Sequence, residues 1–370
     1  MSGEIQPIVM PKWGLAMQEG MVAAWHVEAG TELKSGQEIC DIETSKIANI
    51  FESPVAGPLR RVVAQPGETL PVGALIAVVA DSSVDDAAID AFVEDFQANF
   101  VVEDAGDSGP EPETVDTPAG RVRYLKVGEG DAVPVLFVHG FGGDLNNWMF
   151  NQEALAEDRA TYAIDLPGHG GSTKHVGEGK LAVLSEAVLA FMGALSIEKA
   201  HLVGHSMGGA VALEVASKAP DKAASVTLLA PAGLGPDVNK EFINGFISQN
   251  RAKKLKPVLQ HLVHDPNAIT DEMVEEVIKF KRIDGAVMAL ERLRDGFLFN
   301  EPNVSEAHQR LSALNCPVQV IWGQDDRILA AGHVQGLPHG IKVVHFEHTG
   351  HMPHMERAAE VNELIKAQFS

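Results

Sequence analysis

Residues 201–219 read HLVGHSMGGAVALEVASKA, which is a short apolar strand, a serine between glycines and then a helical stretch. Gly204, Ser206 and Gly208 match the pattern G-x-S-x-G, in which glycines permit a strained turn from strand to helix. Such a turn exposes the serine hydroxyl at the end of a parallel strand. Because the strand and the helix are both present, we interpret Ser206 as a catalytic nucleophile on a sheet covered by helices.

The sequence around this serine alternates apolar strands with helical stretches from about residue 118 to residue 370. This alternation predicts a mostly parallel, doubly wound sheet with helices on both faces. Residues 236–308 are rich in helix formers and contain no obvious sheet strand, so we expect a helical cap there. The expected strands are 133–138, 161–164, 201–203, 225–229, 318–321 and 342–346.

A serine nucleophile needs a base that takes its proton and a carboxylate that orients the base. After a G-x-S-x-G turn these partners follow in the order acid and then histidine. His351 follows the last predicted strand and is the expected base. The strand at 318–321 is followed by two candidate acids, Asp325 and Asp326, of which only one can face the histidine.

These segments resemble the α/β-hydrolases. The pattern W-G-x-x-D-R-I at 322–328 selects Asp326 as the acid, and Gly350-His351 is similar to the histidine loop of that superfamily. HGFGG at 139–143 resembles its HG loop, which implies an oxyanion hole made by the backbone N–H groups of Phe141 and Met207. DLPGHGGS at 165–172 also looks like the superfamily, and we interpret it as a structural turn in which His169 is not catalytic.

The overall charge excludes some partners. Fifty-one acidic against 29 basic residues give a formal charge of −22, which argues against nucleic acid and against anionic membranes as partners. Two cysteines among 370 residues cannot build a disulfide framework, and the start, MSGEIQPIVM, carries no secretory pattern. We therefore expect a cytoplasmic protein without membrane spans or a bound metal.

Composition divides the chain into two domains. Residues 81–120 hold twelve Asp or Glu and no Lys or Arg, so we expect an acidic linker over 81–117 between a domain at 4–80 and one at 118–370. Within it, AIDAFVEDFQANF predicts a short helix, because its apolar residues recur at helical spacing. That helix is expected either to pack on a neighbouring domain or to bind a partner protein.

The first 80 residues read as short strands with a faint internal repeat. Residues 30–39 match residues 67–76 at a constant offset of 37, which suggests two similar β-sheet halves. The matching pairs are Gly30 with Gly67, Leu33 with Leu70, Gly36 with Gly73 and Ile39 with Ile76. Lys46 lies between the two copies, where the chain is expected to turn.

The stretches MPKWGLAMQEG, IETSKIAN and SPVAGPLRRVVAQPGETLPVG resemble the lipoyl domains of 2-oxo acid dehydrogenase complexes. This resemblance implies a small all-β domain with lipoic acid in amide linkage to Lys46. Ser45 stands where many such domains have Asp. Biotinyl domains share the fold and are the alternative, although they usually place Met on both sides of the lysine.

The whole chain resembles the acetyltransferase components of acetoin dehydrogenase complexes. The resemblance implies acetyl transfer from a dihydrolipoyl arm on Lys46 to coenzyme A, through acetyl-Ser206 or by direct transfer between thiols. It also implies three partners: a thiamine-diphosphate-dependent acetoin dehydrogenase, a dihydrolipoamide dehydrogenase and a lipoate ligase or transferase. The basic run RAKKLK at 251–256 is a candidate contact for the coenzyme's phosphates.

Two other functions remain open at the level of sequence. The same three catalytic residues fit a hydrolase of thioester, ester or carbon–carbon bonds, with the small domain as a docking or carrier module. Alternatively, the chain is chiefly a swinging-arm carrier whose large domain binds partner enzymes. Activity toward coenzyme A that depends on lipoate distinguishes these functions.

Overall fold

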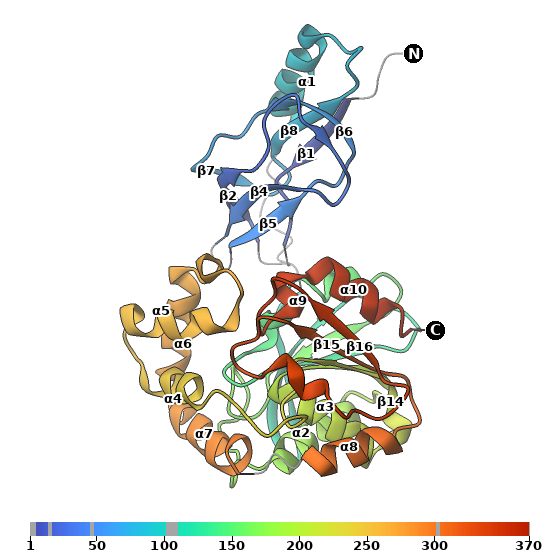
Figure 1. The fold of residues 1–370 in the computed structure, drawn as a ribbon, viewed down its shortest axis with the longest axis vertical. Helices are drawn as coiled ribbons and strands as arrows, with labels where there is room; N and C mark the ends of the chain where they lie inside the picture. Colours follow the sequence, from blue (N-terminus) through green and yellow to red (C-terminus); the bar gives the residue numbers. More distant parts are fainter. Residues whose placement is uncertain (1–4, 14–16, 45–47, 101–109, 301–303, 370) are drawn as a thin grey trace. The chain divides into compact units, whose positions relative to one another are not determined.

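The computed structural model describes residues 5–13, 17–44, 48–100, 110–300 and 304–369. They divide into two compact units, Met1–Gly109 and Pro110–Ser370 (Figure 1). Each unit has a hydrophobic core of its own. Among the described helices, none combines the length and the apolar character needed to cross a membrane.

The smaller unit contains two four-stranded antiparallel sheets, with the strand orders β1-β8-β6-β3 and β5-β4-β2-β7. The inward side chains of both sheets form one core that includes Ile8, Val22 and Ile42. The strands are β1 (Ile5–Val9), β2 (Glu19–Trp25), β3 (Glu32–Leu33), β4 (Glu38–Glu43), β5 (Ala48–Glu52), β6 (Gly57–Val62), β7 (Glu68–Pro71) and β8 (Leu75–Ala80).

The internal repeat has a structural counterpart in these two sheets. An offset of 37 carries the bounds of β4 onto those of β8, and these two strands hold the same place in the two strand orders. The paired glycines adopt the same left-handed backbone, with φ of 97° at Gly30 and 86° at Gly67. Side chains other than glycine seldom adopt this conformation, so the repeated glycines fix equivalent turns. The prediction of two similar β-sheet halves is confirmed.

The acidic segment does contain a helix, α1 (Asp86–Asn99), which packs on the smaller unit. Asp85 caps its start by accepting a hydrogen bond from the backbone N–H of Ala88 at 2.7 Å. Ile89 is fully buried against Leu75 and Val78 of β8. The apolar stripe of this helix is therefore covered within its own unit, as the first of the two sequence interpretations expected.

The larger unit is built on an eight-stranded sheet in the order β16-β15-β14-β13-β11-β12-β10-β9. Strands β11 to β16 run parallel, whereas β9 and β10 form an antiparallel hairpin at one edge. The strands are β9 (Glu113–Thr117), β10 (Gly120–Val127), β11 (Val135–Val138), β12 (Thr161–Ile164), β13 (Ala200–His205), β14 (Ala223–Leu229), β15 (Val318–Gly323) and β16 (Lys342–Phe346). The predicted mostly parallel sheet is confirmed, and β9 begins inside the range that composition assigned to the linker.

Helices cover both faces of this sheet (Figure 1). Along β11, Leu136 and Val138 point toward the core that includes α2 and α3, while Val135 and Phe137 point toward the core that includes α10. This alternation explains why every residue of the strand is apolar. The covering helices are α2 (Leu181–Ala194), α3 (Met207–Lys218), α8 (Val304–Ala313), α9 (Pro353–Glu356) and α10 (Ala358–Lys366).

Between β14 and β15 the chain forms the expected helical cap. Its apolar side chains, including Phe242 and Phe246, join the core on the α2–α3 side of the sheet. The cap helices are α4 (Lys240–Ser248), α5 (Ala252–Leu259), α6 (Asp271–Lys281) and α7 (Ala286–Leu293).

Burial lowers the pKa of several histidines in the larger unit, among them His354 and His201. The ring of His354 lies 4.6 Å from that of Trp148, and neither of its nitrogens has a hydrogen-bond partner among the described residues. Burial lowers the pKa of His354 to about 3. Burial, with the nearby charge of Arg159, lowers the pKa of His201 to about 4. Both rings are thus neutral in the fold well below the pH at which free histidine takes up a proton.

We predict that the larger unit loses stability as the pH falls below about 6.5. Between that pH and the folded pKa values, the unfolded chain binds protons that the fold does not, so each histidine costs about 1.4 kcal/mol per pH unit. In His354→Phe this dependence should be weaker. Denaturant unfolding followed by tryptophan fluorescence at several pH values checks this, with the exposed His345→Phe as control. An equal pH dependence in His354→Phe and the parent would contradict the prediction.

Candidate active site

Ser206 stands at the turn from β13 to α3 with backbone angles φ 54° and ψ −118°. This is a left-handed conformation that non-glycine residues rarely adopt and that costs about 1–3 kcal/mol. The flanking glycines make the turn possible: a Cβ on Gly204 would overlap the carbonyl of Gly208, and a Cβ on Gly208 would overlap the carbonyl of Val138. Only glycine therefore allows strand, turn and helix to pack this closely.

The predicted base and acid lie together, and the ring of His351 is 4.7 Å from that of His205, the residue before Ser206. His351 Nδ1 lies 2.7 Å from Asp326 Oδ2, and both side chains are almost completely buried. The backbone N–H groups of Ile328 and Leu329 donate to Asp326 Oδ1 at 2.8 and 2.9 Å, and Trp322 Nε1 donates to Oδ2 at 2.9 Å. Because Asp326 accepts the Nδ1 proton, a neutral His351 carries its free lone pair on Nε2.

The two successive carboxylates diverge. Asp326 faces His351, whereas Asp325 Oδ2 lies 2.8 Å from Nδ1 of His264, a residue of the cap. The two candidate acids therefore contact different histidines, and of the two only Asp326 contacts the predicted base, His351.

The loop that carries His351 is held by two residues that sequence reasoning missed. His205 Nε2 donates to the carbonyl of His351 at 2.8 Å, and burial keeps the pKa of His205 well below its usual value. The carboxylate of Glu356 accepts the backbone N–H of Gly350 at 3.0 Å and that of His264 at 2.7 Å. Burial raises the pKa of Glu356. These contacts join segments far apart in sequence, so no local pattern indicates them.

The expected oxyanion loop, residues 139–143, lies directly against the serine. A Cβ on Gly140 would lie 3.0 Å from the Cβ of Ser206. His169 holds this loop through a hydrogen bond, because its Nε2 accepts the N–H of Gly142 at 3.0 Å. Met207 begins α3, so its N–H is one of the unpaired donors at a helix start. The structure thus places Phe141 and Met207 on the segments that flank Ser206.

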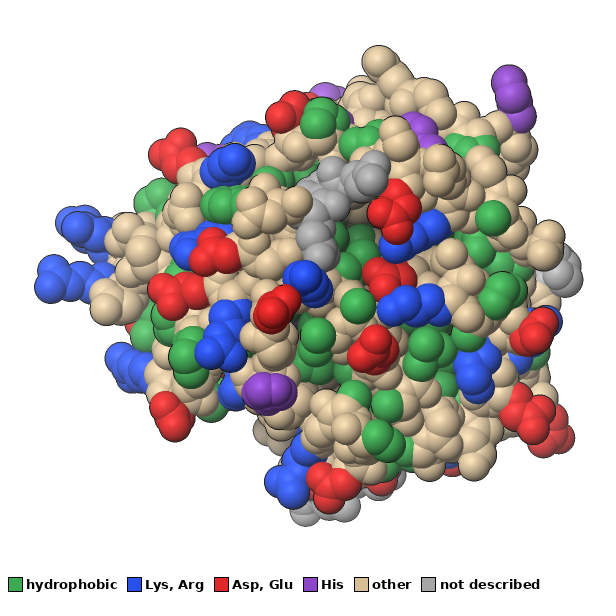
Figure 2. Space-filling view, turned by 90° about the horizontal axis from the view of Figure 1, so that it is seen from below, with side chains coloured by type: hydrophobic (Ala, Val, Ile, Leu, Met, Phe, Trp, Pro, Cys, Tyr) green, Lys and Arg blue, Asp and Glu red, His purple; other side chains and the backbone are tan. Residues whose placement is uncertain are grey.

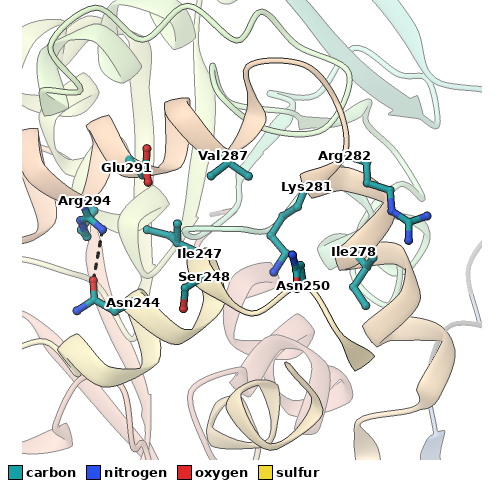
Figure 3. Close-up of a pocket in the computed structure, with 10 residues that line it drawn as sticks. All are labelled: Asn244, Ile247, Ser248, Asn250, Ile278, Lys281, Arg282, Val287, Glu291 and Arg294. Carbon is teal, nitrogen blue, oxygen red and sulfur yellow. Dashed lines mark hydrogen bonds between the residues drawn. The ribbon is translucent and has the colours of Figure 1, made fainter. Parts of the chain in front are cut away.

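The described part of the cap lines a cavity of about 590 Å³ (Figure 3). Helix α4 has one face on the oxyanion loop, where the ring of Phe246 lies 5.9 Å from that of Phe141, and its other face on the cavity. Lys281 Nζ donates to the carbonyls of Phe246 and Gln249, and burial lowers its pKa to about 8. The lining residues are Asn244, Ile247, Ser248, Asn250, Ile278, Lys281, Arg282, Val287, Glu291 and Arg294.

In the smaller unit, the predicted attachment residue Lys46 lies outside the described residues. Its neighbours are informative, because β4 and β5 are antiparallel partners with Glu43 opposite Ala48. The stretch that contains Lys46 therefore connects two adjacent strands. This fits the turn between the repeat copies that the sequence predicted.

Comparisons with known proteins identify both units. Residues 133–358 match the family of the alpha/beta hydrolase fold, and residues 6–79 match the biotin/lipoyl family, described as "Biotin-requiring enzyme". A solved serine hydrolase from Cycloclasticus zankles is 20% identical and superposes with a TM-score of 0.63, covering 70% of this chain and 98% of that one. That likeness shows the fold of the larger unit.

Two curated relatives differ in how much of the chain they match. The 2-hydroxy-6-oxo-6-phenylhexa-2,4-dienoate hydrolase of Comamonas testosteroni is 30% identical over 66% of this chain and 89% of its own length. The dihydrolipoyllysine-residue acetyltransferase component of the acetoin cleaving system of Pseudomonas putida is 44% identical over 98% of both chains. The second match spans the lipoyl unit as well as the hydrolase-fold unit. The chain therefore belongs to the family of dihydrolipoyllysine-residue acetyltransferase components of acetoin cleaving systems.

Proposed function

We propose that this chain transfers an acetyl group from a dihydrolipoyl arm on Lys46 to coenzyme A, with Ser206, His351 and Asp326 as the catalytic residues. One observation carries the proposal: a buried His351–Asp326 pair is joined through His205 to the strained turn of Ser206, in a chain that also contains a lipoyl-type unit. A pure carrier has no use for such a pair. Family membership indicates that the transferred acyl group is acetyl and that the reaction belongs to acetoin cleavage.

The lipoyl group, when bound, supplies a thiol that holds the acetyl group as a thioester. The residues around its expected attachment site fit that role. Lys46 lies in the connection between β4 and β5, which pair with each other. Ile42 of β4 is part of the core, so the strand that leads to Lys46 is anchored. A lysine on a small separate unit brings the attached group to several active sites at high effective concentration.

In the first half-reaction, His351 Nε2 takes the proton of the Ser206 hydroxyl as Oγ attacks the thioester carbonyl. The negative charge that develops on the carbonyl oxygen is stabilised by the N–H groups of Phe141 and Met207. The carbon–sulfur bond then breaks, and His351 returns the proton to the departing thiolate. Ser206 is left as an acetyl ester. Asp326 stabilises the imidazolium that forms in between.

The second half-reaction reverses these roles with a different thiol. His351 removes the proton from coenzyme A, and its sulfur attacks the acetyl ester on Ser206. The Ser206 oxygen leaves and recovers its proton from His351. Water must stay out at this stage, since attack by water would release acetate. Packing of Phe246 from the cap against Phe141 supports such exclusion at the oxyanion loop.

A hydrolase function is the alternative that a specific observation favours. The dienoate hydrolase of Comamonas testosteroni is 30% identical over the larger unit, and its fold can carry the same three catalytic residues. That relative matches only 66% of this chain, and the match to the Pseudomonas putida acetyltransferase component covers 98%. We therefore place acetyl transfer ahead of hydrolysis. Direct transfer between the two thiols, with Ser206 as a donor only, is the mechanistic alternative.

Membership of an acetoin cleaving system implies partner enzymes. We propose that they are a thiamine-diphosphate-dependent acetoin dehydrogenase, which loads the arm, and a dihydrolipoamide dehydrogenase, which reoxidises it. A lipoate ligase or transferase would modify Lys46. Each of these partners follows from the chemistry of the arm, which must be attached, acetylated and returned to its disulfide form.

The net negative charge of the chain repels the phosphates of coenzyme A, so their binding site needs basic side chains that offset this repulsion. On the face of the molecule in Figure 2, basic and acidic side chains lie interspersed, so the carboxylates form no continuous negative surface there. Helix α5 exposes Lys253 and Lys254, while Lys256 pairs with Asp271 at 2.8 Å. We propose that this basic run of the cap meets the phosphates. Arg282 at the cap cavity is the competing contact.

Replacing the nucleophile tests the catalytic assignment. Ser206→Ala should lower the rate of acetyl transfer about 10³-fold or more, because no hydroxyl remains to form the ester. The rate is measured with acetyl-dihydrolipoamide and coenzyme A, and the exposed Ser312→Ala is the matched control. If Ser206→Ala keeps most of the rate, transfer is direct and no acetyl-serine forms.

Replacing the lysine tests the attachment site. In cells with a lipoate ligase, the parent chain should carry the mass of one lipoyl group, and Lys46→Arg should not, since an arginine cannot form the amide. Intact-mass spectrometry measures this, and the exposed Lys34→Arg in the same unit should retain the modification. A modified Lys46→Arg chain would place the arm on another lysine.

Charge removal on the cap tests the acceptor. In a Lys253/Lys254/Lys256→Ala variant, the KM for coenzyme A should rise, and added salt should raise the KM of the parent in the same direction. Initial rates at varied coenzyme A concentration measure it. Arg282→Ala is run beside it, and a rise in that variant alone would move the phosphate contact to the cavity. Acetate release at an unchanged rate without coenzyme A would favour the hydrolase.

A further inference from the structure

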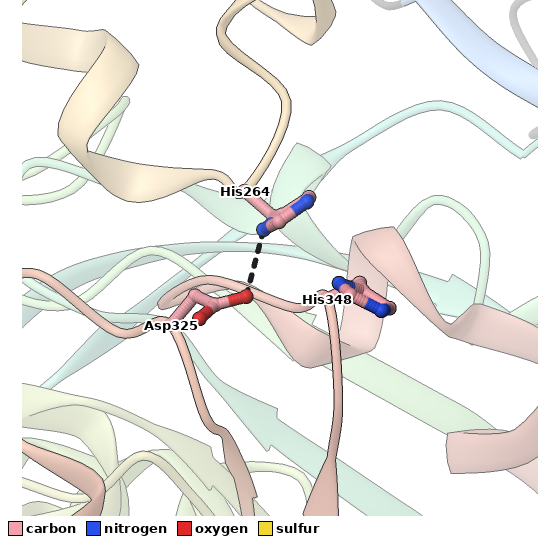
Figure 4. Close-up of side chains that lie close together, drawn as sticks. All are labelled: His264, Asp325 and His348. Atoms are coloured by element: carbon pink, nitrogen blue, oxygen red, sulfur yellow. Dashed lines mark ion pairs between the residues drawn. The ribbon is translucent and has the colours of Figure 1, made fainter.

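Three metal-ligating side chains outside the catalytic set converge near the cap (Figure 4). They are His264 of the cap, Asp325 after β15 and His348 after β16. One ligand atom from each lies within 4.8 Å of those of the other two. The rings of His264 and His348 are 5.3 Å apart at their centroids, in an edge-to-face arrangement.

The backbone segments that carry these side chains are hydrogen-bonded to one another. The N–H of Asp325 donates to the carbonyl of Thr349 at 2.9 Å, which joins the segments of Asp325 and His348. The N–H of His264 donates to Glu356, whose carboxylate also accepts the N–H of Gly350. The three ligand-bearing segments are therefore fixed relative to one another before any ion binds.

From this cluster we propose that His264, Asp325 and His348 form a binding site for a divalent transition metal ion, Zn²⁺. Imidazole nitrogens and one carboxylate oxygen are ligands that Zn²⁺ prefers. Tetrahedral ligands about 2.0–2.1 Å from zinc lie about 3.3 Å from one another, so ligand atoms up to 4.8 Å apart need to approach by at most about 1.5 Å. All three are partly or fully exposed, so rotation can supply this movement, and water can fill the fourth position.

A simple ion pair does not account for the whole cluster. The contact of 2.8 Å between His264 Nδ1 and Asp325 Oδ2 involves those two residues only, and Nδ1 makes no hydrogen bond within the described part of the chain. His348 joins the cluster from a left-handed backbone with φ 52°, which is uncommon among residues other than glycine. A metal ion gives all three side chains a common partner.

The position of the site connects it to the catalytic loops. Asp325 adjoins Asp326, and His348 precedes His351 by three residues. The cap segment beside His264 is already bonded to the catalytic loop, since the N–H of His351 donates to the carbonyl of Leu262 at 2.8 Å. A bound ion would add a second tie between the cap and the loops of the acid and base. It should therefore raise the stability of the larger unit by binding only the folded state.

The experiment uses the untagged full-length chain with the Lys46→Arg change, because the thiols of a reduced lipoyl group would themselves bind zinc. Zinc binding is followed by calorimetry and by the rise in Tm, and Co²⁺ serves as a probe whose absorption reports tetrahedral coordination. His264→Ala and His348→Asn remove one ligand each, and asparagine tolerates the left-handed backbone at 348. His345→Asn, three residues from His348 and also exposed, is the matched control.

The proposal expects one saturable equivalent of zinc, a zinc-dependent rise in Tm, and a tetrahedral cobalt spectrum in the parent and in His345→Asn. Each ligand variant should weaken binding at least about tenfold and lose the rise in Tm. Binding of equal strength in the parent and both ligand variants would overturn the site. The site would also be overturned if His264→Ala lowered the Tm by the same amount with and without zinc. That result would mean that His264 acts only through its ion pair with Asp325.

Discussion

The close packing of backbone around Ser206 is the constraint on which the larger unit depends. Gly208 lies against the carbonyl of Val138, so the first turn of α3 touches the end of β11. The proposed oxyanion loop starts at that end of β11, and Ser206, the proposed nucleophile, stands at the start of α3. One close contact between main chains therefore brings a hydroxyl, a loop of N–H donors and a helix start together. Strain at the serine is the cost of that arrangement.

Asp326 and His351, the proposed acid and base, are held in a different way, by hydrogen bonds to most of their polar atoms. Three donors besides His351 reach the carboxylate of Asp326, so it has little freedom to turn away. The His351 backbone is bonded on both sides, to His205 and to Leu262. The imidazole orientation is thus set by the surrounding main chain before substrate arrives. Such preorganisation removes a reorganisation cost from the chemical step.

The sequence predicted what local patterns can encode. Strand β12 and strand β16 match their predicted ranges, because short apolar runs between turn residues are visible without a structure. The hairpin β9–β10 was not expected, since GRVRYLKV alternates polar with apolar residues and one of its faces is open. The contact of Asp325 with His264 was also not predicted. It depends on His264, which lies in a cap whose helices approach only in the folded chain.

The residues that hold the candidate site in place were also not predictable from local sequence patterns. His205 and His351 are 146 positions apart, and His264 and Glu356 are 92 apart. A sequence motif describes residues within one turn or one helix. These pairs are brought into contact only by the folding of the sheet, so no motif contains both members. Sequence therefore indicates which residues can do chemistry, and the fold determines which other residues hold them still.

The hydrogen bonds between cap residues 262–264 and the loop of His351 have a mechanical consequence. A cap that swung open as one rigid body would have to break them, and it would then release the general base from its position. These contacts tie residues 262–264 to the His351 loop, so a cap opening that keeps His351 in place has to leave this segment where it is.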